Sequence, residues 1–521
     1  MSAPRIMFYH DGRHPLIYMY EPPMQREEYE QAVDELIGTP VEAIMFCLGD
    51  GRTVLHDTRV GELWGTPNEK WSHLIFRRAH QNAKQLIEAG DDPLQVVCER
   101  AHAKGFLFYP TLLLQQGSGE RGEDMRGSNF RFENKHLEIG ASEEIEAGFP
   151  GADCLDFKYE EVRRERFALI EETLNNYPVD GFELQMNYAP FYFHPAQVEE
   201  GCQIMTAWIR EVSEAVKKSG ERRELVVRVP NSIELCLKRG MDLVNWIQEG
   251  LVDALIAEEH LVPSVVTQDT DFTHLVQAAK NSRCRIYASI KSLVDSDRLA
   301  EAPIEIMRAT ASNYWSQGID GLYLAQWFGN WPYDASFYEK LREISDPEVM
   351  APKDKYYFVP AAAGGEALGR KELPAVLEEG KATEVRFNIS DDLKRWGAVG
   401  RVHEVLLRAR IMQSTEIDRL SFELNEVRLP QSSMRKINRM YLMSAPRFRV
   451  FGYWFIFKLA PDQWPQRGEN IFRVLLEYRD EVALPEIVLR DVELEIKYLR
   501  GKNYHRAFVD PDLGAFDNAV I

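Results

Sequence analysis

A strand-like segment of the 521-residue sequence, DGFELQMN (residues 180–187), alternates apolar and polar side chains. Glu183, Gln185 and Asn187 share one face of this predicted strand, because successive side chains on a strand point to opposite sides. A carboxylate on a buried face is costly unless it is paired or used. Carboxylates transfer protons, and amides bind hydroxyl groups. The segment therefore predicts acid–base chemistry on a polyhydroxylated ligand.

Polar residues also close most of the other predicted strands. Glu258 and Glu259 end VDALIAEEH (252–260), and we expect one of them to act as a catalytic partner of Glu183. A wider set of charged, amide and aromatic residues at strand ends and in adjacent loops is expected to bind the ligand. This set is Glu21, Asp50, Arg52, Gln116, Gln185, Asn187, Tyr188, Arg228, Asn231, His260, Lys291, Gln326, Trp327 and Trp331.

The elements that would position these residues alternate between strands and helices through residues 1–349. Eight short apolar segments, each followed by a helical pattern, indicate a (β/α)8 TIM barrel. A doubly wound sheet usually has a glycine-rich turn after its first strand, and EPPMQREEY has none. The predicted strands are residues 15–22, 41–51, 106–115, 180–187, 224–231, 252–260, 285–292 and 321–328.

The pattern changes after residue 349. Residues 350–380, which contain many Ala, Gly and Pro residues, are interpreted as a linker. Segments of period-two alternation in residues 381–502 predict an antiparallel β-sandwich, and residues 503–521 are interpreted as a tail. The sandwich could bind glycan, or it could support the barrel and mediate homo-oligomerisation. We favour the structural role and expect Trp396, Trp454 and Trp464 to pack within the sandwich.

Composition excludes several classes of partner. A net charge of -20 disfavours nucleic acid and anionic membranes as partners. Apolar runs are too short for a spanning helix, and the N-terminus has no signal-peptide pattern, so the cytoplasm is the expected location. The six cysteines are scattered without a CxxC pair, which argues against a zinc cluster. No metal or cofactor is expected, and a carbohydrate substrate is the expected partner.

Structural roles compete with these functional ones. Arg228 could neutralise a glutamate inside the barrel, and Gln185 and Asn187 could satisfy loop backbone groups. Alternation allows only one of Glu258 and Glu259 to face the barrel centre. Three further candidates have equally ordinary explanations as an orienting side chain, a turn former and a core residue: His260, Asp50 and Trp327.

The VDGFELQMNY and GIDGLYLAQWF segments, with the order of barrel and sandwich, resemble bacterial TIM-barrel proteins of the glycoside-hydrolase-like kind. The resemblance implies hydrolysis of a glycosidic bond by two carboxyl groups. In the large retaining clan an acid/base Glu follows strand four, where Glu183 stands, and a nucleophilic Glu follows strand seven, where this chain has Lys291. In α-amylase-like barrels a nucleophilic Asp closes strand four, near Gln185. Neither pattern transfers whole, which leaves Glu183 paired with Glu258 or Glu259.

Three functions follow from these features. The first is a glycoside hydrolase that uses two carboxylates at the C-terminal face of the barrel. The second is a carbohydrate-binding barrel that has lost catalysis, since a carboxylate is missing from the seventh strand. The third is an isomerase or lyase that uses Lys291 as a base or Schiff-base amine.

Overall fold

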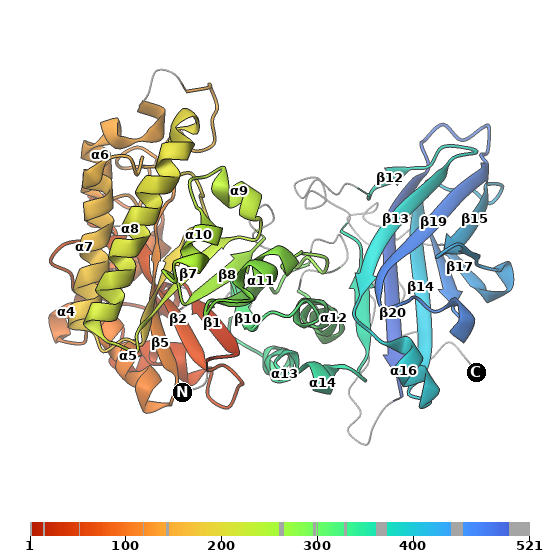
Figure 1. Cartoon of the computed structure of the whole chain (residues 1–521), viewed down its shortest axis with the longest axis horizontal. Helices are drawn as coiled ribbons and strands as arrows, with labels where there is room; N and C mark the ends of the chain where they lie inside the picture. The colour runs from red at the N-terminus through yellow and green to blue at the C-terminus, as the bar shows by residue number, and fades with distance from the viewer. Residues whose placement is uncertain are drawn as a thin grey trace. The chain divides into compact units, whose positions relative to one another are not determined.

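The computed structural model shows two compact units, whose elements are labelled in Figure 1. The first unit consists of Met1–Pro263, Asp271–Ile290 and Gly318–Asp334, and the second of Ser264–Thr270, Lys291–Gln317 and Ala335–Ile521. The structure describes residues 3–13, 16–51, 53–117, 119–141, 145–259, 265–294, 299, 301–327, 331–360, 372–438 and 452–499.

Eight parallel strands of the first unit form a closed barrel, so the predicted (β/α)8 fold is confirmed. β1 pairs with both β10 and β2, which closes the sheet. In order around the barrel the strands are β1 (Ile6–His10), β2 (Ala43–Asp50), β5 (Leu107–Leu113), β6 (Gly181–Gln185), β7 (Glu224–Pro230), β8 (Ala254–Glu258), β9 (Arg285–Ile290) and β10 (Gly321–Leu324). Two short strands, β3 (Thr53–Val54) and β4 (Glu62–Leu63), extend the sheet beside β2.

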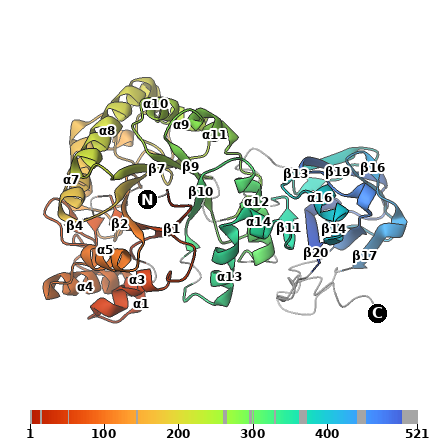
Figure 2. The same ribbon diagram turned by 60° about the horizontal axis from the view of Figure 1, so that its bottom comes forward.

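Helices surround the strands of this unit (Figure 2). The longer ones are α4 (Leu74–Ala89), α5 (Pro93–Ala103), α7 (Glu160–Asn176), α8 (Val198–Ser219), α10 (Leu243–Gln248) and α11 (Thr273–Ala279). Shorter helices are α1 (Leu16–Met19), α2 (Arg26–Tyr29), α3 (Gln31–Asp34), α6 (Asn129–Glu133) and α9 (Ile233–Leu237). Among the described residues, no helix is both long and apolar enough to cross a membrane.

The prediction of the first strand was wrong. Residues 15–22 contain the helix α1, and the first strand is β1, nine residues earlier. Both segments are short apolar runs, which periodicity alone cannot assign to strand or helix. As a consequence Glu21 does not end a barrel strand. Its side chain is exposed and forms an ion pair with Arg78 at 2.5 Å.

Aspartates at the starts of three strands fasten them to their neighbours. The Asp180 carboxylate accepts a hydrogen bond from the backbone N–H of Phe108 at 2.8 Å. Asp253 and Asp320 accept equivalent bonds from neighbouring strands, at 2.8 and 2.7 Å. These bonds satisfy backbone N–H groups that lie before the first regular hydrogen bonds between the paired strands. The aspartates of VDGF, VDAL and IDGL therefore help to fix the register of the strands.

Glycines at the same ends of the strands make room for large side chains in the barrel. A Cβ atom added to Gly181 would lie 2.5 Å from the Tyr109 ring, and one added to Gly321 would lie 2.5 Å from the Tyr287 ring. Both rings are buried in the barrel interior. In the Asp-Gly pairs at residues 180–181 and 320–321, the aspartate therefore binds the backbone of the neighbouring strand, and the glycine leaves space for an aromatic ring.

The second unit contains the predicted antiparallel β-sandwich. One sheet has the order β11 (Lys355–Phe358), β20 (Val488–Tyr498), β14 (Val402–Met412), β18 (Tyr453–Lys458) and β17 (Met434–Asn438), with β12 (Ala375–Val376) also paired to β20. The other has the order β13 (Ala382–Ile389), β19 (Gly468–Tyr478), β15 (Arg419–Leu424) and β16 (Val427–Arg428). Buried side chains from both sheets, among them Phe387, Phe422 and Phe455, form one core.

Two parts of this unit differ from a simple linker and sandwich. The range 350–380 contains β11 and β12, both paired with β20, and residues 503–521 lie outside the described residues. Trp396 and Trp464 pack against the sandwich core, and Trp454 is fully buried. The helices of this unit are α12 (Ile304–Trp315), α13 (Ala335–Ile344), α14 (Pro347–Met350) and α16 (Leu393–Ala398).

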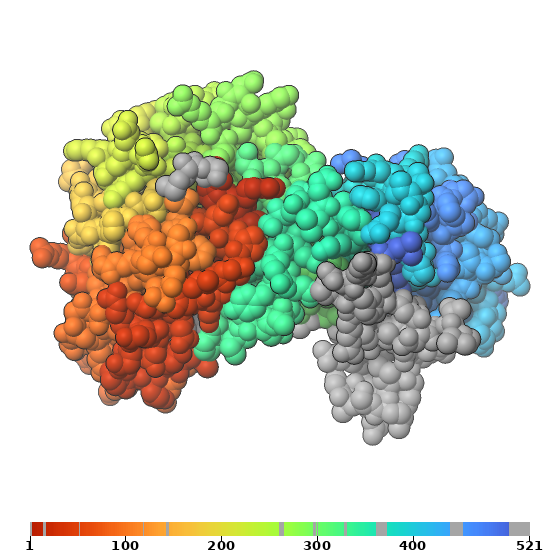
Figure 3. Space-filling model, turned by 90° about the horizontal axis from the view of Figure 1, so that it is seen from below, coloured from red at the N-terminus to blue at the C-terminus, as the bar shows by residue number. Residues whose placement is uncertain are grey.

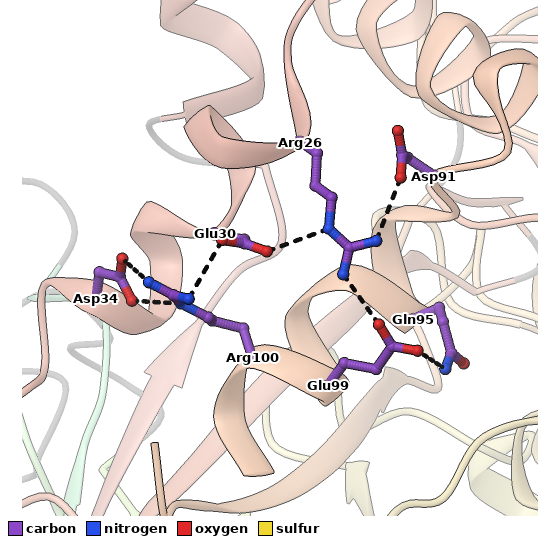
Figure 4. Close-up of polar contacts among 7 residues, drawn as sticks. All are labelled: Arg26, Glu30, Asp34, Asp91, Gln95, Glu99 and Arg100. Carbon is purple, nitrogen blue, oxygen red and sulfur yellow. Dashed lines mark hydrogen bonds and ion pairs between the residues drawn. The ribbon is translucent and has the colours of Figure 1, made fainter. Parts of the chain in front are cut away.

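Ion pairs connect the short helices α2 and α3 to α5 on the surface of the barrel unit. This region belongs to the red and orange part of the chain in Figure 3. Arg26 contacts three carboxylates and Arg100 two, and Glu30 is shared between them (Figure 4). The other three carboxylates are Asp34, Asp91 and Glu99. Because these groups are partly exposed, each pair contributes about 1 kcal/mol or less.

Glu305, in the first turn of α12, predicts a pH dependence of folding stability. Burial raises its pKa to about 7, against the opposing effect of Arg308. The folded form therefore retains a proton that the unfolded chain loses near pH 4.5, so the free energy of unfolding should fall as pH rises from about 4.5 to 7. The full effect is on the order of 3 kcal/mol.

Urea unfolding of wild type and Glu305→Gln between pH 4.5 and 8 measures this contribution. We expect the two proteins to be similarly stable at pH 4.5 and the variant to be the more stable one at pH 8. Glu348→Gln, which changes an exposed residue of α14, is the matched control. Parallel pH profiles for wild type and Glu305→Gln would contradict the assignment.

Candidate active site

The side chain of Arg228 occupies the interior of the barrel and connects two buried carboxyl groups. Its Nε donates to Glu183 Oε1 at 2.7 Å, and its Nη1 lies 3.7 Å from Glu258 Oε2. The guanidinium carbon lies 4.4 Å from the centre of the Tyr9 ring and 4.6 Å from that of Tyr323. The strands β1, β6, β7, β8 and β10 thus meet at one cation.

Strand register explains why these side chains meet. Gln185 of β6 is aligned with Arg228 of β7, so Glu183 lies one interior layer below Arg228. Pro230 of β7 is aligned with Glu258 of β8, which places Glu258 one interior layer above. Arg228 therefore lies between a lower and an upper carboxyl group near the C-terminal ends of the strands, where barrel enzymes carry their active sites.

Glu183 is enclosed. Its side chain is 0% exposed, and both of its oxygens accept hydrogen bonds from the Tyr323 hydroxyl, at 3.2 and 3.1 Å. Burial raises the pKa of Glu183, while Arg228, Tyr323 and Thr111 favour the ionised form. Burial also disfavours the Arg228 cation, yet Glu183 and its other anionic neighbours leave the pKa of Arg228 above its usual range.

Glu258 is held by groups of the upper layer. Its Oε1 accepts from Asn187 Nδ2 at 2.6 Å, and its Oε2 accepts from the Ser289 hydroxyl at 2.6 Å. Its side chain is 2% exposed. Glu258 thus faces the barrel interior, as alternation requires of one member of the 258–259 pair.

Amide and hydroxyl groups complete the upper part of the network. Gln185 donates to the hydroxyl of Thr111 on β5. Among the described residues, two buried atoms next to this network have no hydrogen-bond partner: Asn187 Oδ1 and Arg228 Nη2. A buried polar atom without a hydrogen-bond partner destabilises the folded protein unless a ligand or a water molecule forms a hydrogen bond with it. An acceptor and a donor next to Glu258 suit a ligand that carries hydroxyl groups.

Other predicted residues have structural contacts. Gln116 is buried, and its carbonyl accepts from Arg131 at 2.6 Å. Asn231 donates from its backbone to the Glu258 carbonyl at 3.0 Å. Trp327 is buried and donates from its indole to the Ile290 carbonyl at 3.0 Å, as a core residue would. Trp331 donates to Glu35 at the end of α3.

The remaining predicted residues divide into three groups. Tyr188 is 56% exposed in the loop after β6. Gln326, two residues beyond the end of β10, adopts a left-handed backbone conformation (φ 58°) that is uncommon outside glycine. Glu259 and Lys291 are buried at the ends of β8 and β9, and Lys291 is grouped with the second unit. Outside the described residues lie the side chain of Asp50, Arg52 and His260.

The sequence patterns did not identify Tyr9, Tyr323 and Asp11. Tyr9 lies on β1 and Asp11 directly follows it, whereas periodicity predicts the first strand at residues 15–22. A signal was present, because YHDGR (9–13) at the end of β1 resembles LGDGR (48–52) at the end of β2. Asp11 is buried there and accepts from the backbone N–H of Arg13 at 2.9 Å. Tyr323 occupies an interior position of DGLYLAQ, in phase with Gly321 and Ala325.

No metal site is evident in the described parts of the chain, where no three His, Cys, Asp or Glu side chains are arranged to hold an ion. A cavity of about 720 Å³ opens at the opposite, N-terminal end of the barrel, beside Tyr109, Arg223 and Arg285. Glu183, Arg228 and Glu258 do not line this cavity, so the cavity and the buried charged cluster lie at opposite ends of the barrel. We place the candidate active site at the end that carries Glu258.

Comparison with known proteins gives similarity at the level of structure. No protein-family model and no curated protein sequence matches the chain. Solved structures similar to it include an α-amylase from Geobacillus thermoleovorans complexed with acarbose, with 10% identity, a TM-score of 0.42, and coverage of 92% of this chain and 99% of that one.

Two further similar structures are longer than this chain. A cycloisomaltooligosaccharide glucanotransferase from Paenibacillus sp. has 10% identity, a TM-score of 0.35, and coverage of 94% of this chain and 57% of that one. An α-L-fucosidase isoenzyme from Paenibacillus thiaminolyticus has 10% identity, a TM-score of 0.42, and coverage of 68% and 51%. The chain therefore spans little more than half of either protein. Such distant similarities concern the fold and assign no activity.

Removing the cation should expose its role in folding. Arg228→Met leaves Glu183 buried without a counter-ion, so we expect a loss of about 3–5 kcal/mol in the free energy of unfolding at pH 7. Adding Glu183→Gln should restore much of this loss. Urea unfolding of the two single variants and the double variant measures the coupling.

Arg26→Ala, in the exposed network of Figure 4, controls for loss of a partly exposed arginine and should cost at most about 1 kcal/mol for each of its three ion pairs. A similarly small cost for Arg228→Met would contradict the interpretation of Arg228 as the counter-ion of a buried carboxylate.

Proposed function

We propose that the chain is a glycoside hydrolase that cleaves the O-glycosidic bond of an oligosaccharide or glycoside with the carboxyl groups of Glu183 and Glu258. The observation that carries this proposal is that both groups contact one guanidinium, that of Arg228, near the C-terminal ends of the barrel strands.

Glycoside hydrolysis commonly needs one protonated and one ionised carboxyl group. Two buried carboxylates beside one guanidinium leave an excess negative charge, so a proton shared by the pair is stabilised. Burial raises the pKa of Glu183, which favours that group as the proton carrier. Glu258, held by Asn187 and Ser289 in the upper layer, is the carboxyl group closer to the substrate side.

The surrounding groups suit a sugar. Asn187 presents an acceptor oxygen and Arg228 a donor nitrogen that have no partner among the described residues. Sugar hydroxyls both donate and accept hydrogen bonds, and the C–H faces of sugars stack on aromatic rings. Tyr188, exposed in the loop after β6, offers such a ring. Each feature supports carbohydrate recognition at this end of the barrel.

A carbohydrate-binding barrel without catalysis is the second candidate, and one observation favours it. Glu183 is fully buried, with Arg228, Tyr323 and Thr111 all directed at its carboxyl group. A group enclosed in this way can serve as the counter-ion of Arg228 alone. In that case the chain would bind sugars and leave glycosidic bonds intact.

Glu258→Gln tests the proposal. The amide keeps the shape of the side chain but cannot carry the charge, so we expect kcat to fall by about 10²–10⁴-fold on a glycoside that wild type hydrolyses. Turnover is measured on a panel of aryl glycosides and oligosaccharides, with melting temperature as the check on folding. Glu221→Gln, an exposed residue at the N-terminal end of the barrel, is the control and should match wild type.

Three outcomes separate the candidates. Wild-type turnover by Glu258→Gln together with loss of turnover by Glu259→Gln would move the catalytic role to the neighbouring glutamate. Sugar binding by wild type without turnover of any glycoside in the panel would support the binding protein. Loss of turnover by Glu183→Gln, together with a shifted pH profile of turnover in Tyr323→Phe, would support Glu183 as the proton carrier.

A further inference from the structure

Arg239, at the end of the barrel that carries the candidate active site, stacks on an aromatic ring and has no polar partner among the described residues. Arg239 follows α9 in the loop after β7, at the same end of the barrel as Glu258. Its guanidinium carbon lies 4.1 Å from the centre of the Phe191 ring. Among the described residues its guanidinium forms no hydrogen bond and no ion pair, and its Nε atom is buried.

This isolation is unusual in an acidic chain. The sequence has 82 acidic and 62 basic residues, and most of the arginines described above contact a carboxylate or a carbonyl. Burial lowers the pKa of Arg239, and no carboxylate in the described parts of the chain offsets that effect. A half-buried cation of this kind is stabilised when an anion enters the site.

The ring beneath Arg239 is part of a firmly packed wall. Phe149 meets Phe191 edge to face, with ring centres 5.3 Å apart. A Cβ atom added to Gly151 would lie 2.5 Å from Phe191, so glycine is needed there for the approach. We call Phe149, Phe191 and Arg239 the Arg239 wall.

Close packing also holds the adjacent loop. The ring of Phe193 lies against both Gly201 of α8 and Gly240, and a Cβ atom on either glycine would lie 2.5 Å from it. Gly240 directly follows Arg239 and has a positive φ of 85°. The segment that carries Arg239 is therefore fixed against the loop that carries Phe191.

Hydrogen bonds tie the wall to the ends of the barrel strands. Gln115, which follows β5, donates to the Phe191 carbonyl at 2.8 Å. The same loop begins with Asn187, whose amide donates to Glu258, and with the exposed ring of Tyr188. The wall and the carboxylate thus share one loop.

We propose that the Arg239 wall binds an anionic substituent of a sugar, so that the substrate is an acidic glycan that carries a uronic acid carboxylate or a sulfate ester. The planar guanidinium can donate two parallel hydrogen bonds to such a group. The exposed Tyr188 ring on the same loop offers a stacking surface for the sugar. The substrate class rests on the proposed function, whereas anion binding by Arg239 does not.

Hydrolysis of matched substrates tests the substrate class. The probes are 4-nitrophenyl hexosides, the corresponding hexuronides and the 6-sulfated hexosides, in both anomers and in the gluco and galacto series. We expect wild type to prefer one anionic series over its neutral counterpart by tenfold or more in kcat/KM. Which of the two anionic series is preferred identifies the group.

Variants of Arg239 test the residue. Arg239→Ala should reduce the preference for the anionic substrate to less than about twofold. Arg239→Lys should retain part of this preference, because lysine keeps the positive charge but cannot donate two parallel hydrogen bonds. Arg222→Ala removes the same charge from an exposed position before β7 and should keep the wild-type preference. Equal or better hydrolysis of the neutral hexosides by wild type, or an unchanged preference in Arg239→Ala, would overturn the proposal.

A binding measurement keeps the two proposals separate. Calorimetry with glucuronate, galacturonate, glucose 6-sulfate and the neutral hexoses is performed on wild type and on Glu258→Gln. Tighter binding of an anionic sugar that Arg239→Ala loses would support the Arg239 wall even if no glycoside is hydrolysed, in which case only the hydrolase proposal fails. Equal binding of anionic and neutral sugars would overturn the inference while leaving hydrolysis to be judged on turnover.

Discussion

The charge of Arg228, buried in the interior of the barrel, governs the arrangement around it. A guanidinium removed from water requires anionic and hydrogen-bonding partners, and it receives them from several strands. Glu183 accepts its Nε–H, and the centres of the Tyr9 and Tyr323 rings lie 4.4 and 4.6 Å from its guanidinium carbon. Glu258, one layer above, lies in reach of the same cation. Removing any of these groups changes the electrostatic environment of the others.

The same constraint links stability to chemistry. Two carboxyl groups and one cation form a set in which the protonation of one glutamate depends on the charge of the other. Glu183 is enclosed by Arg228, Tyr323 and Thr111, whereas Glu258 accepts hydrogen bonds from Asn187 and Ser289 at the end where the loop after β6 carries Tyr188 and Phe191. The interior of the barrel therefore changes from a packed aromatic layer near Tyr109 and Tyr287 to a polar layer near Glu258.

Much of the fold could be predicted because the strands are short apolar runs separated by amphipathic helices. The exception, β1, shows the limit of that method. IMFYH and LIYM are both brief apolar segments, and only pairing of the former with β2 and β10 identifies it as the strand that closes the barrel. The site was affected in turn, since Glu21 was predicted in place of the residues at the end of β1. Trp331, predicted as a ligand-binding residue, donates its indole N–H to Glu35, which directly follows α3.

The sequence by itself determined the barrel, the sandwich and the polar face of DGFELQMN, because period-two alternation and amphipathic helices depend on neighbouring residues. It also identified Arg228 and Glu258 as members of a polar set. Only the tertiary structure decided that Glu183 and Arg228 are paired, that Glu258 is the member of its pair that faces the interior, and that Arg239 meets Phe191. These contacts join residues that are about 30 to 48 positions apart, and strand register and barrel closure set them.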